Sequence, residues 1–351
     1  MRVWSVLLLG VALLSTRAAA LETDQFTVPA QPLVDLGPVV DDKVAFELQQ
    51  VIAHAKAERA SELEQARTTH WKWLANKHRQ QADDVISSDG VADAFYHAIA
   101  GGSVPECKIE DWILEKHTLR AALLQPMSVS DSVYGANPFE RPFLLIELSP
   151  TVRLHDRYVG VDKLGHFFQQ GHEYYERFVE ARAAGKTEAE AIRLAVAGGV
   201  KQEHGFYGEA IIGIYSNADL AANYAGLLFY RNLMETVHFG NQTIEPMLSW
   251  EGQKLVLTTR AKDGPTKPFI TEHWNEAMNP CHYVGYWRPY VKERIAAKVD
   301  AWMAFNHSTP ALEAARLQRI TTFDGTDYGH SGFRDVITLA NATLPDSFAS
   351  R

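Results

Sequence analysis

The chain has 351 residues, of which 46% are hydrophobic and 22% are charged, a composition typical of a globular protein and unlike that of a disordered chain. Its formal net charge of −9 argues against nucleic acid as a partner, because phosphate binding requires a basic surface. The length suits one large domain or two small ones.

The N-terminus has the pattern of a secretory signal. Arg2 precedes an apolar run over residues 3–14, and Ala18, Ala19 and Ala20 supply the small side chains of a cleavage site. The run of about 12 residues is shorter than the roughly 20 that span a bilayer. Residues 1–20 are therefore predicted to be a signal peptide cleaved near Ala20. The mature chain is expected to be periplasmic or secreted, with no integral membrane span.

Residues 21–40 contain three prolines and little periodicity, so they are predicted to form an extended arm on the domain surface. The acidic pair at 41–42 marks a helix start, because acidic side chains favour the positive end of the helix dipole. From there to about residue 85 the chain has no proline or glycine and a helical spacing of apolar residues. Trp71 and Trp73 in this stretch are interpreted as packing residues.

The region 161–233 is predicted to form the core, with three helices over residues 162–184, 187–198 and 216–237. Thr187 and Glu190 form a capping-box pattern at the start of the second helix. Ser216 is a candidate N-cap for the third. These signals place the helix starts.

Beyond Gly240 the pattern changes to strand-like residues. Residues 247–260 predict a β-hairpin with its turn at Glu251 and Gly252. We therefore expect a mostly α-helical fold, a helical bundle with one small β-hairpin in the C-terminal third. A single mainly helical domain is expected over residues 41–351.

The sequence contains two cysteines, Cys107 and Cys281. In an oxidising compartment they could form a disulfide that ties the N-terminal half of the chain to its C-terminal part. The alternative is a pair of buried free thiols. The sequence leaves both alternatives open.

Two of the predicted central helices each carry a pair of polar residues four positions apart. Asp162 and His166 form one pair, and Asp219 and Asn223 form the other. Residues at this spacing share a helix face, and bundles build metal centres from carboxylates and imidazoles on facing helices. The candidate metal ligands are Asp162, His166, Glu203, His204 and Asp219, with Lys163, Ser216 and Asn223 in supporting positions.

This mixed oxygen and nitrogen set suits a divalent metal such as zinc, manganese or iron better than calcium. A bound metal could activate water for hydrolysis of an ester, amide or phosphate. The alternative is a non-enzymatic envelope binding or structural protein, in which His166 bonds Asp219 or Asn223 in a buried hydrogen-bond network. The motifs of the common enzyme classes are absent from the sequence, so whether the protein is an enzyme stays open.

Further polar residues lie outside the central motifs. His172 follows His166 by six positions and lies off its helix face, so it is expected to support the site without binding a metal. A second polar group in the C-terminal third either completes the site or forms an exposed polar helix end, and the exposed end is the favoured interpretation. Its members are Glu272, His273, Glu276 and His282.

The central motifs resemble a pattern shared by the VanZ-like proteins and the YfiM-like bacterial envelope proteins. The matching residues are Asp162, Lys163, His166, Phe167, Glu203, Ser216, Asp219, Leu220, Ala222, Asn223 and Gly226. The match covers about 70 of the 351 residues. The resemblance implies a helical protein of the cell envelope, with an envelope component as partner and no established reaction. VanZ-like members are embedded in the membrane, whereas this chain lacks several long apolar spans.

Overall fold

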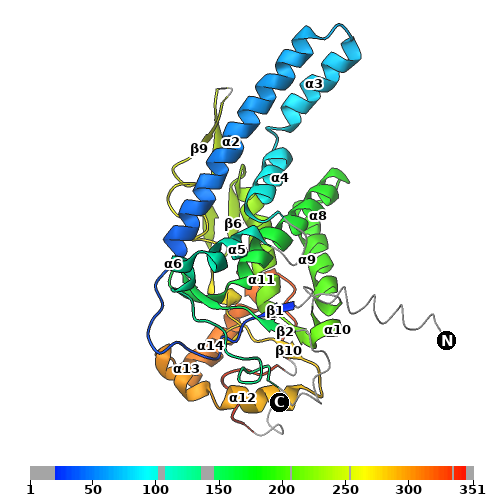
Figure 1. The fold of residues 1–351 in the computed structure, drawn as a ribbon. Coiled ribbons are helices and arrows are strands. Elements are labelled where there is room, and N and C mark those ends of the chain that lie inside the picture. Colours follow the sequence, from blue (N-terminus) through cyan, green and yellow to red (C-terminus); the bar gives the residue numbers. More distant parts are fainter. Residues whose placement is uncertain are drawn as a thin grey trace, which may run out of the picture.

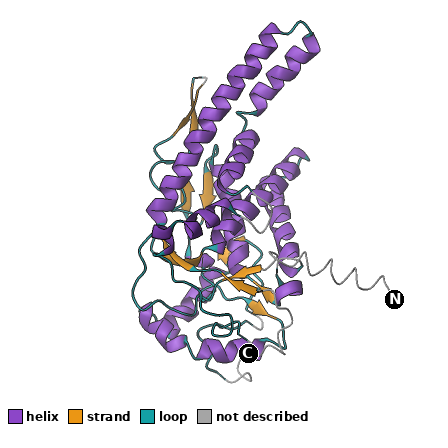
Figure 2. Cartoon of the chain, viewed as in Figure 1, coloured by secondary structure: helices purple, strands orange, loops and turns teal. Residues whose placement is uncertain are grey.

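The computed structural model describes residues 20–101, 107–135, 146–205, 208–252, 254–333 and 336–344. The predicted signal peptide lies outside the described residues, except for the backbone of Ala20. The fold is mostly helical with several small two-stranded sheets, which confirms the predicted fold class (Figure 2).

The α-helices in chain order are α2 (Gly37–Thr68), α3 (Lys72–Asp84), α4 (Ser88–Ile99), α5 (Lys108–Glu115), α6 (His117–Arg120), α7 (Asp162–Gly165), α8 (Gly171–Ala183), α9 (Glu188–His204), α10 (Glu209–Ile212), α11 (Asn217–Asn232), α12 (Arg288–Ala296), α13 (Val299–Phe305) and α14 (Pro310–Ile320). The π-helical turn η1 (His166–Gln170) joins α7 to α8. A 3-10 turn, η2 (Glu272–Trp274), lies in the C-terminal third.

The strands are short and pair two at a time. One pair is parallel, β1 (Ala20–Glu22) with β2 (Ile146–Leu148). The antiparallel pairs are β3 (Thr151–Leu154) with β4 (Arg157–Gly160), β5 (Ile214–Tyr215) with β10 (His282–Tyr283), β6 (Val237–Phe239) with β7 (Gln242–Ile244), β8 (Leu248–Glu251) with β9 (Lys254–Leu257), and β11 (Thr322–Phe323) with β12 (Thr326–Asp327). The β8–β9 pair is the predicted hairpin, and Gly252 in its turn has the positive φ of 63° that favours glycine.

The predicted starts of the central helices are confirmed. Thr187 caps α9 in a complete capping box with Glu190. Ser216 Oγ accepts a hydrogen bond from the Asp219 backbone N–H at 3.2 Å, at the start of α11. Such caps depend only on residues within one turn, so the sequence reveals them. The second helix runs six residues beyond the predicted end at Gly198, to His204.

Helix α11 is the centre of the fold. Every residue from 217 to 230 is buried, and α7, η1, α8 and α9 all contact the helix. Helices α8 and α11 meet at two glycines: a Cβ on Gly226 would lie 2.1 Å from the Phe167 carbonyl oxygen, and one on Gly171 would lie 2.6 Å from Gly226 Cα. The two backbones therefore touch, which holds η1 and α7 against the first turns of α11.

Aromatic side chains fill the space around α11. The ring of Phe229 contacts the rings of Phe95, Phe167 and Phe168 with centroid distances of 5.0–5.7 Å. A second, smaller apolar cluster lies around Trp287 and Trp302 beneath the C-terminal helices. Among the described residues no helix, including α11, combines the length and apolar character needed to cross a membrane.

The prediction that residues 21–40 form an arm on the domain surface is wrong for residues 22–26. Residues 22–26 are all buried, with exposed fractions of 1–8%. The helix that follows begins at Gly37, not at the acidic pair, because Pro38 has the fixed φ that suits a first helical turn. Asp41 instead accepts a hydrogen bond from the Thr266 backbone N–H at 2.9 Å. A tertiary contact, and not the helix dipole, determines the position of this acid.

The long N-terminal helical stretch forms two antiparallel helices. Helices α2 and α3 make a hairpin that projects from the rest of the molecule (Figure 1). Beyond Ala55, the only buried residue of α2 is Ala66. Trp71 and Trp73 lie at the tip and are 68% and 67% exposed, so their interpretation as packing residues is wrong. Helical spacing alone does not reveal whether another element covers a helix face.

Cys107 and Cys281 are both buried free thiols, so the disulfide alternative is wrong. Cys107 precedes α5 and packs in the main core, whereas Cys281 belongs to the second apolar cluster. Each thiol therefore serves as a small apolar side chain in its own core.

Candidate functional site

Lys163 lies at the centre of a buried charged cluster. Its side chain is 0% exposed, and its Nζ lies 2.7 Å from Asp162 Oδ2, 2.6 Å from Asp219 Oδ1 and 2.6 Å from Glu276 Oε1. Burial would lower the pKa of Lys163, but these three carboxylates raise that pKa well above its usual value. The three carboxylates around Lys163 therefore favour its ammonium form.

His166 contacts the second oxygen of the Asp219 carboxylate. Its Nε2 lies 3.1 Å from Asp219 Oδ2, and its Nδ1 faces the side-chain amide of Asn223 at 3.1 Å. Burial would lower the pKa of His166, but the charge of Asp219 and its hydrogen bond raise that pKa to about 9. The His166 side chain is 13% exposed. The two helix faces predicted from the sequence therefore do meet, through Asp219.

The C-terminal polar group supplies Glu276 to the cluster. Glu276 is 0% exposed, and the turn η2 ends two residues before it, so the favoured interpretation of an exposed polar helix end is wrong. Tyr134 Oη donates a hydrogen bond to Glu276 Oε2 at 2.5 Å, and the Glu276 backbone N–H donates to Gln25 Oε1. Spacing of Glu272 and Glu276 along the chain gave no sign of this environment.

The N-terminal arm also reaches the cluster, which sequence reasoning missed entirely. Thr23 Oγ1 donates a hydrogen bond to Asp162 Oδ1 at 2.6 Å. Glu22 is 2% exposed, and burial together with the charges of Glu276 and Asp219 raises its pKa well above the usual value. The parallel pairing of β1 with β2 is what brings the arm here. No local signal in a proline-containing segment indicates such a long-range pairing.

Glu203 lies near the end of α9 and borders the cluster. Its Oε1 accepts a hydrogen bond from the Ser216 backbone N–H at 2.8 Å, which links α9 to the start of α11. Burial and the charge of Asp219 raise the pKa of Glu203 to about 8, and burial raises the pKa of Glu276 to about 7. Five carboxyl groups thus act electrostatically on Lys163, and His166 is a second cationic group beside them. The carboxyls are Glu22, Asp162, Glu203, Asp219 and Glu276, and the cations are Lys163 and His166.

The raised pKa values predict that the protein loses stability as the pH rises. The pKa of Glu203 rises from 4.5 to about 8 on folding, so between these pH values the folded protein binds more protons than the unfolded chain. The pKa of His166 rises from 6.5 to about 9, which adds a loss in the same direction between these values. We expect the free energy of unfolding to be larger at pH 6 than at pH 9 by at least about 1 kcal/mol. Denaturant titrations at the two pH values measure this difference.

A matched pair of variants assigns the effect to the cluster. Glu203→Gln keeps the acceptor oxygen but cannot ionise, so it should reduce the difference between pH 6 and pH 9. Glu180→Gln changes an exposed carboxyl of α8 and should leave the difference as in the wild type. Equal pH dependence in the wild type and Glu203→Gln would contradict the assignment.

Two predicted site residues lie outside the cluster. His204 is 56% exposed and its Nδ1 lies 2.7 Å from Glu209 Oε2, because the last residue of α9 turns outward there. His172 faces α4, where its Nε2 lies 3.0 Å from Asp93 Oδ1 and its ring stacks on Tyr96 at 4.3 Å. The π-helical turn η1 lies between His166 and His172.

The remaining histidines of the C-terminal polar group also lie elsewhere. His273 stacks on Phe323 with a centroid distance of 4.0 Å. His282 Nδ1 lies 3.7 Å from Glu209 Oε1. Of the four residues in that group, Glu276 alone contacts Lys163.

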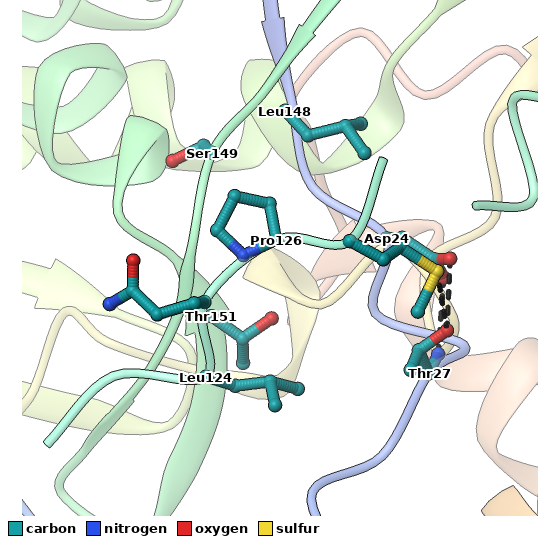
Figure 3. Close-up of a pocket in the computed structure, with 9 residues that line it drawn as sticks. Asp24, Thr27, Leu124, Pro126, Leu148, Ser149 and Thr151 are labelled. Carbon is teal, nitrogen blue, oxygen red and sulfur yellow. Dashed lines mark hydrogen bonds between the residues drawn. The ribbon is translucent and has the colours of Figure 1, made fainter. Parts of the chain in front are cut away.

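A small pocket adjoins the cluster. It has a volume of about 40 Å³ and is lined by Asp24, Thr27, Leu124, Gln125, Pro126, Met127, Leu148, Ser149 and Thr151 (Figure 3). Ser149 joins the pocket to the site, because its Oγ accepts a hydrogen bond from the Asp162 backbone N–H at 3.1 Å. This volume admits water but not a substrate-sized molecule.

Two groups of side chains could each hold a metal ion. The ligand atoms of Asp162, His166 and Asp219 all lie within 4.8 Å of one another, and so do those of Asp93, His172 and Glu176. In the first group both carboxylates are buried. In the second group both carboxylates are 57% exposed. The first group is therefore the better candidate, because enclosed carboxylates gain most from a bound cation.

The fold and the site together define a mostly helical protein with a buried Asp–His–Lys cluster that could hold a metal. No family model matches the chain, and neither a curated protein nor a solved structure matches it. The chemistry of the cluster is therefore what indicates a function for this chain.

Proposed function

We propose that this chain binds a divalent transition metal through Asp162, His166 and Asp219. The observation that carries the proposal is the convergence of their ligand atoms within 4.8 Å, inside a buried cluster with five carboxyls and two cations. Buried carboxylates without counter-charge are costly, so they either keep protons or bind a cation. A divalent ion bound by Asp162, His166 and Asp219 would take the place of protons held by the cluster.

We also propose that the protein acts in the bacterial envelope after export. The N-terminal pattern of Arg2, an apolar run and three small residues ending at Ala20 supports export. The resemblance of the central motifs to VanZ-like and YfiM-like proteins supports an envelope location. Detection of the processed chain in a periplasmic fraction tests this part of the proposal.

The ligand chemistry suggests which metals to test. Two carboxylates and one imidazole favour zinc, manganese or iron over calcium. His166 must lose its proton to bind a metal, so metal binding should release protons and strengthen as the pH approaches 9. With water at an open coordination position, such a centre would support hydrolysis, which is the enzymatic form of the proposal.

The metal proposal predicts a loss of affinity on removal of either central ligand. In His166→Ala and Asp219→Asn we expect zinc affinity to fall by on the order of tenfold or more, because each variant removes one ligand. Calorimetric titration of the chelator-treated full chain with Zn²⁺, supported by elemental analysis, measures the affinity and stoichiometry. Mn²⁺ is titrated in parallel.

The second group provides the matched control. His172→Ala removes a ligand from the Asp93–Glu176 group and should leave the high-affinity binding unchanged. Loss of binding in His172→Ala but not in His166→Ala would show that the metal binds to Asp93, His172 and Glu176. Failure of the wild type to bind any of the tested metals would overturn the proposal.

A structural network is the second candidate, and one observation favours it. Lys163 Nζ already contacts Asp162 Oδ2 and Asp219 Oδ1, so two of the carboxylates have a cation without any metal. In that case the cluster fixes the packing of α7 against α11 and binds nothing. If the cluster is such a structural network, His166→Ala should have a lower melting temperature than the wild type, and the wild type should contain no bound metal.

A further inference from the structure

The tip of the α2–α3 hairpin carries two unusually exposed tryptophans. Trp71 and Trp73 are 68% and 67% exposed, the highest values among the exposed large hydrophobic residues described. They lie at the start of α3, at the end of the hairpin farthest from the body of the protein (Figure 1). A large exposed apolar surface of this kind marks an interaction site.

The segment around the tip is positively charged, whereas the whole chain has a negative net charge. Residues 65–82 contain no Asp or Glu and four basic residues, in a chain with a net charge of −9. The basic residues are Arg67, Lys72, Lys77 and Arg79, and all four are exposed. Arg67 pairs with Glu64 at 2.8 Å. Within the described residues the other three have no carboxylate partner, so their charge is available to a ligand.

The hairpin holds this tip away from the body. From Ala55, where α2 leaves the core, to Thr68 the helix rises by roughly 20 Å. His78 Nδ1 lies 2.7 Å from Glu62 Oε2 and joins the two helices near the tip. The alanines at 66, 75 and 82 are buried in the hairpin, where their small side chains allow close packing. The tip therefore projects from the body, and contacts between α2 and α3 hold it in place.

We infer that this tip docks the protein on an anionic phospholipid bilayer. Indole rings partition into the membrane interface, where the apolar body is buried and the N–H stays wet. Lysines and arginines near the surface gain from the negative potential of anionic headgroups. A neutral glycan would be bound by the tryptophans alone, whereas the acid-free basic stretch specifically matches an anionic surface. The inference is independent of the proposed metal centre.

Sedimentation of the full chain with vesicles tests the inference. Vesicles of phosphatidylglycerol and phosphatidylcholine should bind the protein, and binding should weaken in vesicles of phosphatidylcholine alone. Each cation removed should weaken binding roughly fivefold, so Lys72→Ala with Lys77→Ala should cost roughly 25-fold. Trp71→Ser with Trp73→Ser should reduce binding at least as much. All these positions are exposed, so circular dichroism should show an unchanged melting temperature.

Matched substitutions elsewhere control for composition. Trp250→Ser alters an exposed tryptophan of the β8 strand, and Lys186→Ala alters an exposed lysine after α8, and both should bind as the wild type. Equal binding to both vesicle types, or wild-type binding by both tip variants, would overturn the inference. Absence of vesicle binding by the wild type would also overturn it, and would leave a protein partner as the occupant to seek.

Discussion

Replacement of Lys163 by methionine is expected to lower the free energy of unfolding by about 3–5 kcal/mol. The substitution keeps most of the side-chain volume but removes the ammonium that contacts Asp162, Asp219 and Glu276. Three buried carboxylates would then face one another without their shared cation, and breaking a buried ion pair from one side leaves uncompensated charge. Urea unfolding followed by circular dichroism at pH 7 measures the loss.

The pH dependence of the variant separates charge from packing. At acidic pH the carboxyls take up protons, so the difference between Lys163→Met and the wild type should shrink as the pH falls towards 4. Lys186→Met, at an exposed position, should stay within about 0.5 kcal/mol of the wild type. A Lys163→Met protein as stable as the wild type at pH 7 would show that the carboxylates do not depend on this ammonium.

Replacement of Gly226 by valine is expected to lower the free energy of unfolding by about 3 kcal/mol. A Cβ at this position would lie 2.1 Å from the Phe167 carbonyl oxygen, so α11 and the helix that contains Phe167 must move apart. The atom in the way is backbone, which cannot rotate aside. Because this contact also places His166 against Asp219, the variant should lose zinc affinity along with stability. Thermal unfolding and zinc titration measure the two effects.

Gly198 in α9 provides the control for this substitution. The three atoms nearest to a Cβ there all belong to the flexible side chain of Arg177, at 3.0–3.1 Å. Gly198→Ala should therefore be neutral or stabilise the protein by up to about 1 kcal/mol, because alanine favours a helix more than glycine does. If Gly226→Val behaved like Gly198→Ala, the two helices would not be in backbone contact.

The sequence predicted those parts of the site that depend on one helix at a time. Asp162 and His166 share a face because they are one turn apart, and Ser216 caps α11 through a contact three residues away. The convergence of His166 on Asp219 rested on one further assumption, that the two helices pack together. The close contact between Gly171 and Gly226 shows that the two helices do pack together.

The members that the sequence did not reveal come from distant segments of the chain. Thr23 reaches Asp162 across 139 residues, and Glu276 reaches Lys163 across 113. Such contacts depend on where whole elements dock, and the residues around Thr23 and Glu276 carry no periodic pattern that would show it. The same limit explains the error at Trp71 and Trp73, whose spacing fits a buried helix face that no other element covers.

By itself the sequence determined the helical class, the starts of the central helices, the β8–β9 hairpin, the polar face shared by α7 and η1, and the polar face of α11. Short-range hydrogen bonds and side-chain periodicity produce these features, and both act within a few residues. The tertiary structure alone decided that Lys163, and not only the Asp–His pairs, lies at the centre of the cluster, and that five carboxyls surround it. The physical reason is burial: an enclosed site excludes water, so its charge balance depends on the charged side chains that every surrounding segment contributes.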